Sequence, residues 1–92
     1  MNILKTPFKI EVGNIKDAIK VLLVLETYGF RFNTDQKIEI LVPSFFRDYR
    51  EIIIYVNAKK NYLNYSGKYW ESAQEPKYGL QYTVEEFLNY GF

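Results

Sequence analysis

The N-terminal part of the chain alternates apolar and polar positions before it changes to a helical spacing. Phe8, Ile10 and Val12 alternate with charged residues, and this period of two predicts a half-buried strand over residues 8–12. The apolar positions then recur at the spacing of one helix face, and they are Ile15, Ala18, Ile19, Leu22 and Leu25. We therefore expect a strand followed by one long helix, over residues 15–28, that lies across a sheet.

Local signals place both ends of this helix. Asn14 is a favoured N-cap, and Asp17 falls in the first turn, where a negative charge interacts favourably with the helix dipole. No glycine or proline interrupts the segment before Gly29, which suits the position after a helix because glycine readily adopts positive φ. The next three residues, 30–32, return to an extended pattern.

The segment that follows is predicted to form a strand and then an ambiguous connection. Residues 36–42 alternate, and the apolar side of this predicted strand carries Ile38, Ile40 and Val42. Pro43 ends the strand, because proline has no N–H to donate to a neighbouring strand. Residues 44–49 fit either a loop or a single helical turn capped by Ser44.

The next two segments are predicted to form a hairpin. Residues 51–56 are apolar on both faces, which is typical of a central strand. Residues 57–61 form a polar turn of the length expected in a hairpin, and residues 62–66 pair back as the next strand. Residues 68–82 fit either a long ordered loop or an irregular edge strand.

A capping box marks the last element. Thr83 is followed three residues later by Glu86, so the two side chains can cap each other's backbone N–H groups. Tyr82 and Phe87 stand at the positions of a hydrophobic staple around this box. We expect a short C-terminal helix that runs to about Tyr90.

These elements predict an α+β fold in a single domain over residues 1–92. Their order is β-α-β-β-β-β-α, and residues 30–32 either count as a strand of their own or do not. Short connections and the hairpin indicate a mainly antiparallel sheet of about four strands. The long helix is expected to pack on one face of this sheet.

The composition excludes several classes of site. The 92 residues include no histidine and no cysteine, so neither a histidine-based catalytic triad nor an ordinary zinc or copper site can form. Two carboxylate pairs, Asp48 with Glu51 and Glu85 with Glu86, have no further acids to cluster with. We therefore expect no enzyme activity, no cofactor and no bound metal. The net charge of +1 argues against a dedicated binder of duplex DNA.

No targeting or membrane segment is visible in the sequence. Charged residues interrupt the first twelve positions, which do not resemble a secretory signal. The longest apolar run, residues 21–25, is far shorter than the roughly 20 residues that span a bilayer. We therefore expect a cytoplasmic protein.

Aromatic side chains are concentrated in the C-terminal half. Eight of the nine tyrosines and the single tryptophan lie between residues 49 and 90, interleaved with lysine, asparagine and serine. Such rings are favoured at binding surfaces because they offer large contact areas with few rotatable bonds. The candidate binding residues are Tyr62, Tyr65, Lys68, Tyr69, Trp70, Lys77 and Tyr78. The alternative is that these rings serve as half-buried filler in a thin core.

Phe45 and Phe46 form a second aromatic feature. Two adjacent side chains cannot both point inward from an extended segment. Either one ring is exposed as an anchor for a ligand, or the segment turns and buries both rings. We expect burial.

Several segments together carry a resemblance to a class of small proteins. They are Phe-Lys-Ile-Glu-Val, Glu-Thr-Tyr-Gly-Phe, Ile-Ile-Ile-Tyr-Val, the tyrosine-rich segment and Thr-Val-Glu-Glu-Phe-Leu. The chain resembles small accessory proteins of bacteriophages and other mobile elements, many of which act in counter-defence, such as anti-CRISPR proteins. The resemblance implies a protein that binds a host protein, such as a CRISPR-like defence effector, and inhibits it sterically.

Two other functions stay open at this point. An oligomeric sponge would sequester a nucleotide immune signal, with aromatic rings stacked on the base and lysines on the phosphates. A weak single-stranded nucleic-acid binder would use the same groups along a nucleotide chain. A flat apolar patch favours the protein inhibitor, a deep aromatic pocket favours the sponge, and a steep salt dependence favours the nucleic-acid binder.

Overall fold

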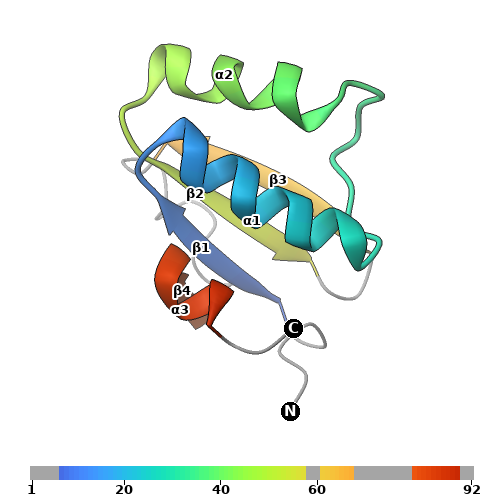
Figure 1. Ribbon diagram of the computed structural model, residues 1–92, viewed down its shortest axis with the longest axis vertical. Coiled ribbons are helices and arrows are strands. Elements are labelled where there is room, and N and C mark those ends of the chain that lie inside the picture. The colour runs from blue at the N-terminus through green and yellow to red at the C-terminus, as the bar shows by residue number, and fades with distance from the viewer. Residues whose placement is uncertain (1–6, 58–60, 68–79, 90–92) are drawn as a thin grey trace.

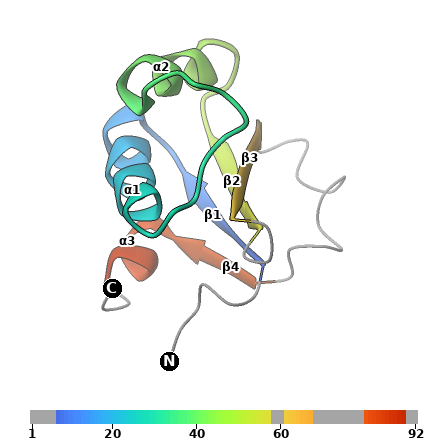
Figure 2. The same cartoon turned by 90° about the vertical axis from the view of Figure 1, so that its right-hand side faces the viewer.

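Three helices cover one face of a four-stranded sheet in the computed structural model, which describes residues 7–57, 61–67 and 80–89 (Figure 1). The elements in chain order are β1 (Phe8–Val12), α1 (Ile15–Thr27), α2 (Ile38–Asp48), β2 (Ile52–Asn57), β3 (Tyr62–Gly67), β4 (Leu80–Thr83) and α3 (Val84–Leu88). Figure 2 shows the helices together on one side of the strands. The α+β class is confirmed, but the order is β-α-α-β-β-β-α.

The sheet is mixed, which corrects the expectation of a mainly antiparallel one. The strand order is β3-β2-β1-β4. Strand β2 pairs antiparallel with both β1 and β3, whereas β4 pairs parallel with β1 and places Leu80 opposite Phe8. The alternation of side chains is the same in parallel and antiparallel strands, so the pattern of residues 80–83 carries no sign of this direction.

The structure places residues 36–42 differently from the predicted strand. They belong to the end of a loop and to the first half of α2, which continues through the ambiguous segment as far as Asp48. Pro43 lies inside this helix although it has no N–H for the carbonyl four residues before it. Proline inside a helix costs roughly 3 kcal/mol, so the packing of α2 must offset that cost.

Burial beneath α2 explains why a helix forms here. Ile38, Val42 and Phe45 recur at i, i+4 and i+7, and all three are buried. A strand would turn Ile40 inward together with Ile38 and Val42, yet Ile40 is 62% exposed. A helix and a strand both place Ile38 and Val42 on the same face. The pattern of residues 38–42 alone therefore does not distinguish a helix from a strand.

Strand β2 is the central strand that its two-sided apolar pattern predicts. Every residue from 52 to 56 is buried, in a strand that is paired on both sides. The main core beneath the helices includes Ile52, Ile54 and Val56, and a second cluster consists of Ile53 and Tyr55. The hydroxyl groups of Tyr55 and Ser66 hydrogen-bond at 2.9 Å, which satisfies the polar end of a buried ring.

The ends of α1 form as the sequence predicts. Asn14 Oδ1 accepts the N–H of Asp17 at 2.8 Å, and Asn14 Nδ2 donates to the Asp17 carboxylate at 3.0 Å. Gly29 has a φ of 91°, and the N–H groups of Gly29 and Phe30 donate to carbonyls of the last helical turn. This pair of bonds is a Schellman arrangement, which ends the helix one residue earlier than predicted.

The predicted capping box begins α3. Thr83 Oγ1 accepts the N–H of Glu86 at 3.1 Å, and Glu86 Oε1 accepts the N–H of Thr83 at 2.9 Å. The rings of Tyr82 and Phe87 both pack on Phe8 of β1, with centroid distances of 5.5 and 6.0 Å. The box and these rings fix α3 against the sheet.

We expect Thr83→Ala to lower the free energy of unfolding by about 0.5–2 kcal/mol, because the Glu86 N–H then loses its acceptor. Thr27→Ala is the matched control in a denaturant melt. Thr27 is exposed within α1, where its hydroxyl only adds a bond to the Leu23 carbonyl at 2.9 Å. Equal losses of stability in the two variants would show that the capping bond contributes nothing.

Candidate protein-interaction surface

The structure describes two of the seven residues that the sequence singles out for binding. Tyr62 and Tyr65 lie in β3, while the other five lie outside the described residues, namely Lys68, Tyr69, Trp70, Lys77 and Tyr78. Tyr62 is 39% exposed, and strand alternation places it on the face opposite Tyr65. The assignment of a binding surface to these seven residues therefore stays a prediction.

Tyr65 belongs partly to the core. Its ring stacks on Phe45 with a centroid distance of 3.7 Å and meets Phe32 edge-on at 6.5 Å. Phe45 itself is buried and Phe46 is half-buried, because successive helical residues differ in direction by about 100°. The segment turns and buries Phe45 as expected, but Phe46 is only half-buried, so the expected burial of both rings is confirmed in part. One side of the Tyr65 ring is occupied within the fold.

Two backbone donors on the outer edge of β3, at Leu63 and Tyr65, have partners. The N–H of Leu63 donates to the Arg31 carbonyl at 2.9 Å, and the Arg31 N–H donates to the Asn61 carbonyl at 3.2 Å. The N–H of Tyr65 donates to Oδ1 of Asn64 at 2.8 Å. An added strand would need such donors. The part of this edge around Leu63 is therefore already occupied by Arg31.

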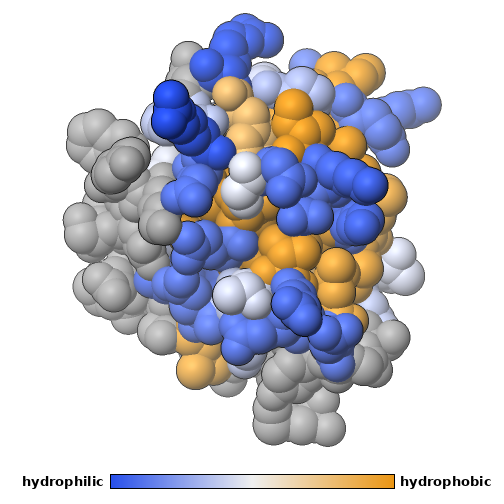
Figure 3. Space-filling model, turned by 60° about the vertical axis from the view of Figure 1, so that its left-hand side comes forward, coloured by the Kyte–Doolittle hydropathy of each residue, from blue (hydrophilic) through white to orange (hydrophobic). Residues whose placement is uncertain are grey.

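A second candidate surface lies on the outer side of α1 and α2. Ile15, Ile19 and Leu23 recur every four residues, so they form one row along α1. Ile15 and Leu23 are 40% and 43% exposed, and Phe46 extends the row because it lines one depression together with Ile15. We call Ile15, Ile19, Leu23 and Phe46 the helical apolar surface. Figure 3 shows a face of the molecule on which hydrophobic side chains emerge between strongly hydrophilic ones.

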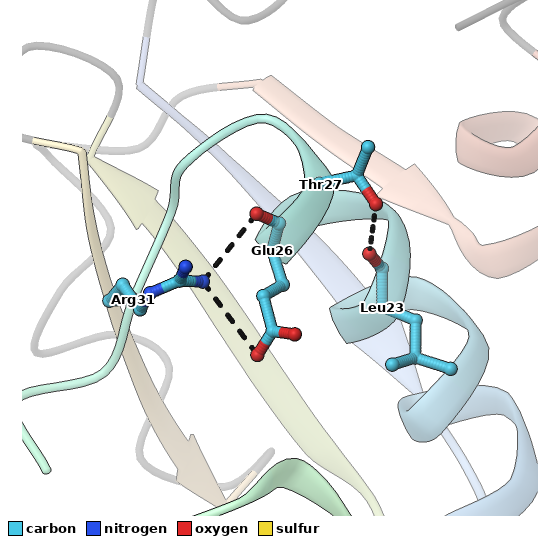
Figure 4. Close-up of polar contacts among 4 residues, drawn as sticks. All are labelled: Leu23, Glu26, Thr27 and Arg31. Atoms are coloured by element: carbon cyan, nitrogen blue, oxygen red, sulfur yellow. Dashed lines mark hydrogen bonds and ion pairs between the residues drawn. The ribbon is translucent and has the colours of Figure 1, made fainter. Parts of the chain in front are cut away.

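Exposed hydrogen bonds and an ion pair lie at the C-terminal end of this row. Thr27 Oγ1 donates to the Leu23 carbonyl at 2.9 Å, and Arg31 Nη1 reaches the Glu26 carbonyl at 3.5 Å and its carboxylate at 3.7 Å (Figure 4). Such an exposed ion pair contributes little to stability. The Leu23 side chain points away from these groups, which leaves it open to a partner (Figure 4).

An open depression of about 450 Å³ lies at the other end of the row. It is lined by Asn14, Ile15, Phe46, Arg47, Tyr49 and Arg50. No carboxylate lines it among the side chains that the structure describes. Within the described parts of the chain, neither arginine has a recorded hydrogen bond or ion pair. The depression thus joins apolar and aromatic walls with two cationic groups.

A second depression, of about 410 Å³, lies on the other side of Asn14 and has the opposite charge. Its lining includes four acidic residues, which are Glu11, Asp17, Glu51 and Glu85. The group does not form a metal site, since no cluster of three or more potential ligands occurs among the described residues. The start of α1 therefore separates a basic depression from an acidic one.

The crevice between α1, the following loop and α2 is small. Its volume is about 30 Å³, and its walls include Leu22, Phe30 and Leu63. That volume holds about one water molecule, far less than a nucleotide needs. The described helices include none with both the length and the apolar character needed to cross a bilayer.

Comparison with family models, curated proteins and solved structures finds no match. The helical apolar surface and the two arginines must therefore be interpreted from their own chemistry. Sequence reasoning assigned Ile15 and Ile19 to the face of α1 that packs on the sheet, and it did not single out Leu23 or the arginines. The sequence feature that could have indicated this surface is the apolar stripe of α1, which is wider than contact with one sheet requires.

Proposed function

We propose that this chain is a protein-binding module that binds a host protein and inhibits it sterically. The observation that carries this proposal is the helical apolar surface, on which Ile15 and Leu23 stay 40% and 43% exposed. An apolar row bordered by charged side chains is a common form of protein interface. The choice of a defence effector as the target comes from the resemblance to phage accessory proteins.

The support beneath this surface favours binding. The opposite side of α1 is fixed by fully buried side chains, namely Ala18, Val21, Leu22 and Leu25. A surface that is ordered before binding loses little conformational entropy when a partner arrives. The helical apolar surface therefore has the rigidity that an inhibitor needs.

The two alternative functions receive less support from the described residues. Tyr55 is an aromatic residue at the centre of the sheet, yet it is 1% exposed and cannot stack on a base. The crevice of about 30 Å³ is too small for a nucleotide, and the larger basic depression of about 450 Å³ is open where a sponge needs a deep pocket around the base. A nucleotide found by mass spectrometry with the purified chain would favour the sponge instead.

The test is affinity capture from a bacterial lysate with the tagged chain. We expect one host protein to be retained by the wild type and lost with Leu23→Glu. Leu80→Glu is the matched control, because Leu80 is a 51% exposed leucine in β4, outside the helical apolar surface. The activity of the captured protein should then fall as wild-type chain is added.

Two results would contradict the proposal. One is that the Leu23→Glu variant retains as much of the host protein as the wild type does, when circular dichroism shows that both chains are folded. The other is a captured protein whose activity is unchanged by a saturating amount of the chain.

A further inference from the structure

We infer that the partner presents an acidic segment with one apolar anchor side chain, which docks in the basic depression between the start of α1 and the end of α2. This inference rests on the proposed function and names the chemistry of the partner. The anchor would pack against Ile15, Phe46 and Tyr49, and the carboxylates would pair with Arg47 and Arg50.

The charge of the depression selects an acidic partner. Arg47 and Arg50 are exposed, and neither has a recorded partner among the residues that the structure describes. The positive end of the α1 dipole and the negative end of the α2 dipole both border this depression, so its charge preference comes from the two arginine side chains. Arginine is favoured at interfaces because its planar group binds a carboxylate with two parallel hydrogen bonds.

The walls of the depression fit an apolar anchor. Ile15 is exposed, whereas Phe46 and Tyr49 are half-buried and pack against the main core. The Tyr49 ring lies so close to Gly67 that a Cβ at that position would overlap it. This contact limits movement of the ring, and a fixed aromatic wall beside arginines is typical of the residues that dominate binding energy.

The acidic depression on the other side of Asn14 restricts how the partner lies. Glu85 and Asp17 line it, so an acidic segment placed there would be repelled. The segment should therefore run along the end of α2. The same carboxylates disfavour a nucleic acid, whose continuous phosphates need more cationic groups than two arginines.

The first experiment titrates the ¹⁵N-labelled chain with a synthetic peptide that holds one phenylalanine among aspartates and glutamates. We expect amide shifts at residues 14–15 and 46–50. Two control peptides replace the acids by asparagine and glutamine, or the phenylalanine by alanine. Each control should bind about tenfold more weakly, because each lacks one of the two contacts.

The second experiment locates the charge. The double variant Arg47→Gln with Arg50→Gln should bind the acidic peptide about tenfold more weakly than the wild type, as expected when two charge pairs are lost. The matched control is Lys20→Gln with Lys37→Gln, two exposed positions outside the depression. Both pairs change the net charge from +1 to −1, so the control should bind within about twofold of the wild type. Melting curves check that both variants fold.

Three results would overturn the inference. The first is that the amides of residues 14–15 and 46–50 do not shift at millimolar peptide. The second is that the arginine and lysine double variants lose equal affinity for the acidic peptide. The third is that the chain binds an oligothymidine more tightly than it binds the peptide. A captured host protein that still binds the arginine variant would remove this inference and leave the proposed function intact. Peptide binding without any captured protein would remove the proposed function alone.

Discussion

Phe45→Ala is expected to lower the free energy of unfolding by about 3–5 kcal/mol in a denaturant melt. Phe45 is 1% exposed, and its ring stacks on Tyr65 at 3.7 Å and contacts Phe32 at 5.3 Å. Alanine would leave a cavity where α2 packs on β3. Native domains are stable by about 5–15 kcal/mol, so this single change removes a large part of the total.

Ile40→Ala is the control that separates a helix from a strand in this segment. Ile40 is 62% exposed on α2, so its truncation should change stability by less than about 0.5 kcal/mol. A strand over residues 36–42 would bury Ile40 beside Ile38 and Val42, and Ile40→Ala would then cost about 2–5 kcal/mol. A loss above about 2 kcal/mol for Ile40→Ala would therefore contradict the helix.

Leu22→Ala should cost about 2–5 kcal/mol, because Leu22 is fully buried where α1 packs on the sheet. Its neighbour gives a matched control, since Leu23 is 43% exposed on the helical apolar surface. Leu23→Ala should change stability little, as exposed positions usually do. A loss below about 1 kcal/mol for Leu22→Ala would mean that this face of α1 does not carry the core.

The sequence predicted those parts of the fold in which one pattern stands alone. The caps Asn14 and Gly29 define α1, and the Thr83 capping box defines the start of α3. The two-sided apolar run of β2 has no competing helical interpretation, because it is short and rich in β-branched residues. In each case local propensity and tertiary packing favour the same structure.

The remaining parts of the fold depend on contacts between distant residues. Pro43 normally ends an element, and burial of Phe45 beneath α2 outweighs that local preference. The parallel pairing of β4 with β1 joins segments about 70 residues apart, which no local pattern encodes.

The surface proposed from the structure was not predicted from the sequence, and the assignment of binding to the seven residues between 62 and 78 stays a prediction. Strand alternation puts Tyr62 and Tyr65 on opposite faces of β3, and of the two only Tyr65 packs against the main core. The helical apolar surface was missed because an apolar stripe alone does not reveal how much of it the sheet covers. The arginines of the basic depression were missed because Arg47 and Arg50 approach Ile15 only when α2 packs beside α1.

We propose that a host protein binds to the outer side of α1 and α2. The most direct measurement adds the captured host protein to the ¹⁵N-labelled chain and maps the amides that change. We expect changes at Ile15, Ile19, Leu23 and Phe46, and none of similar size in β4. Changes confined to residues 62–78 would contradict it and would place the interface on the tyrosine-rich segment instead.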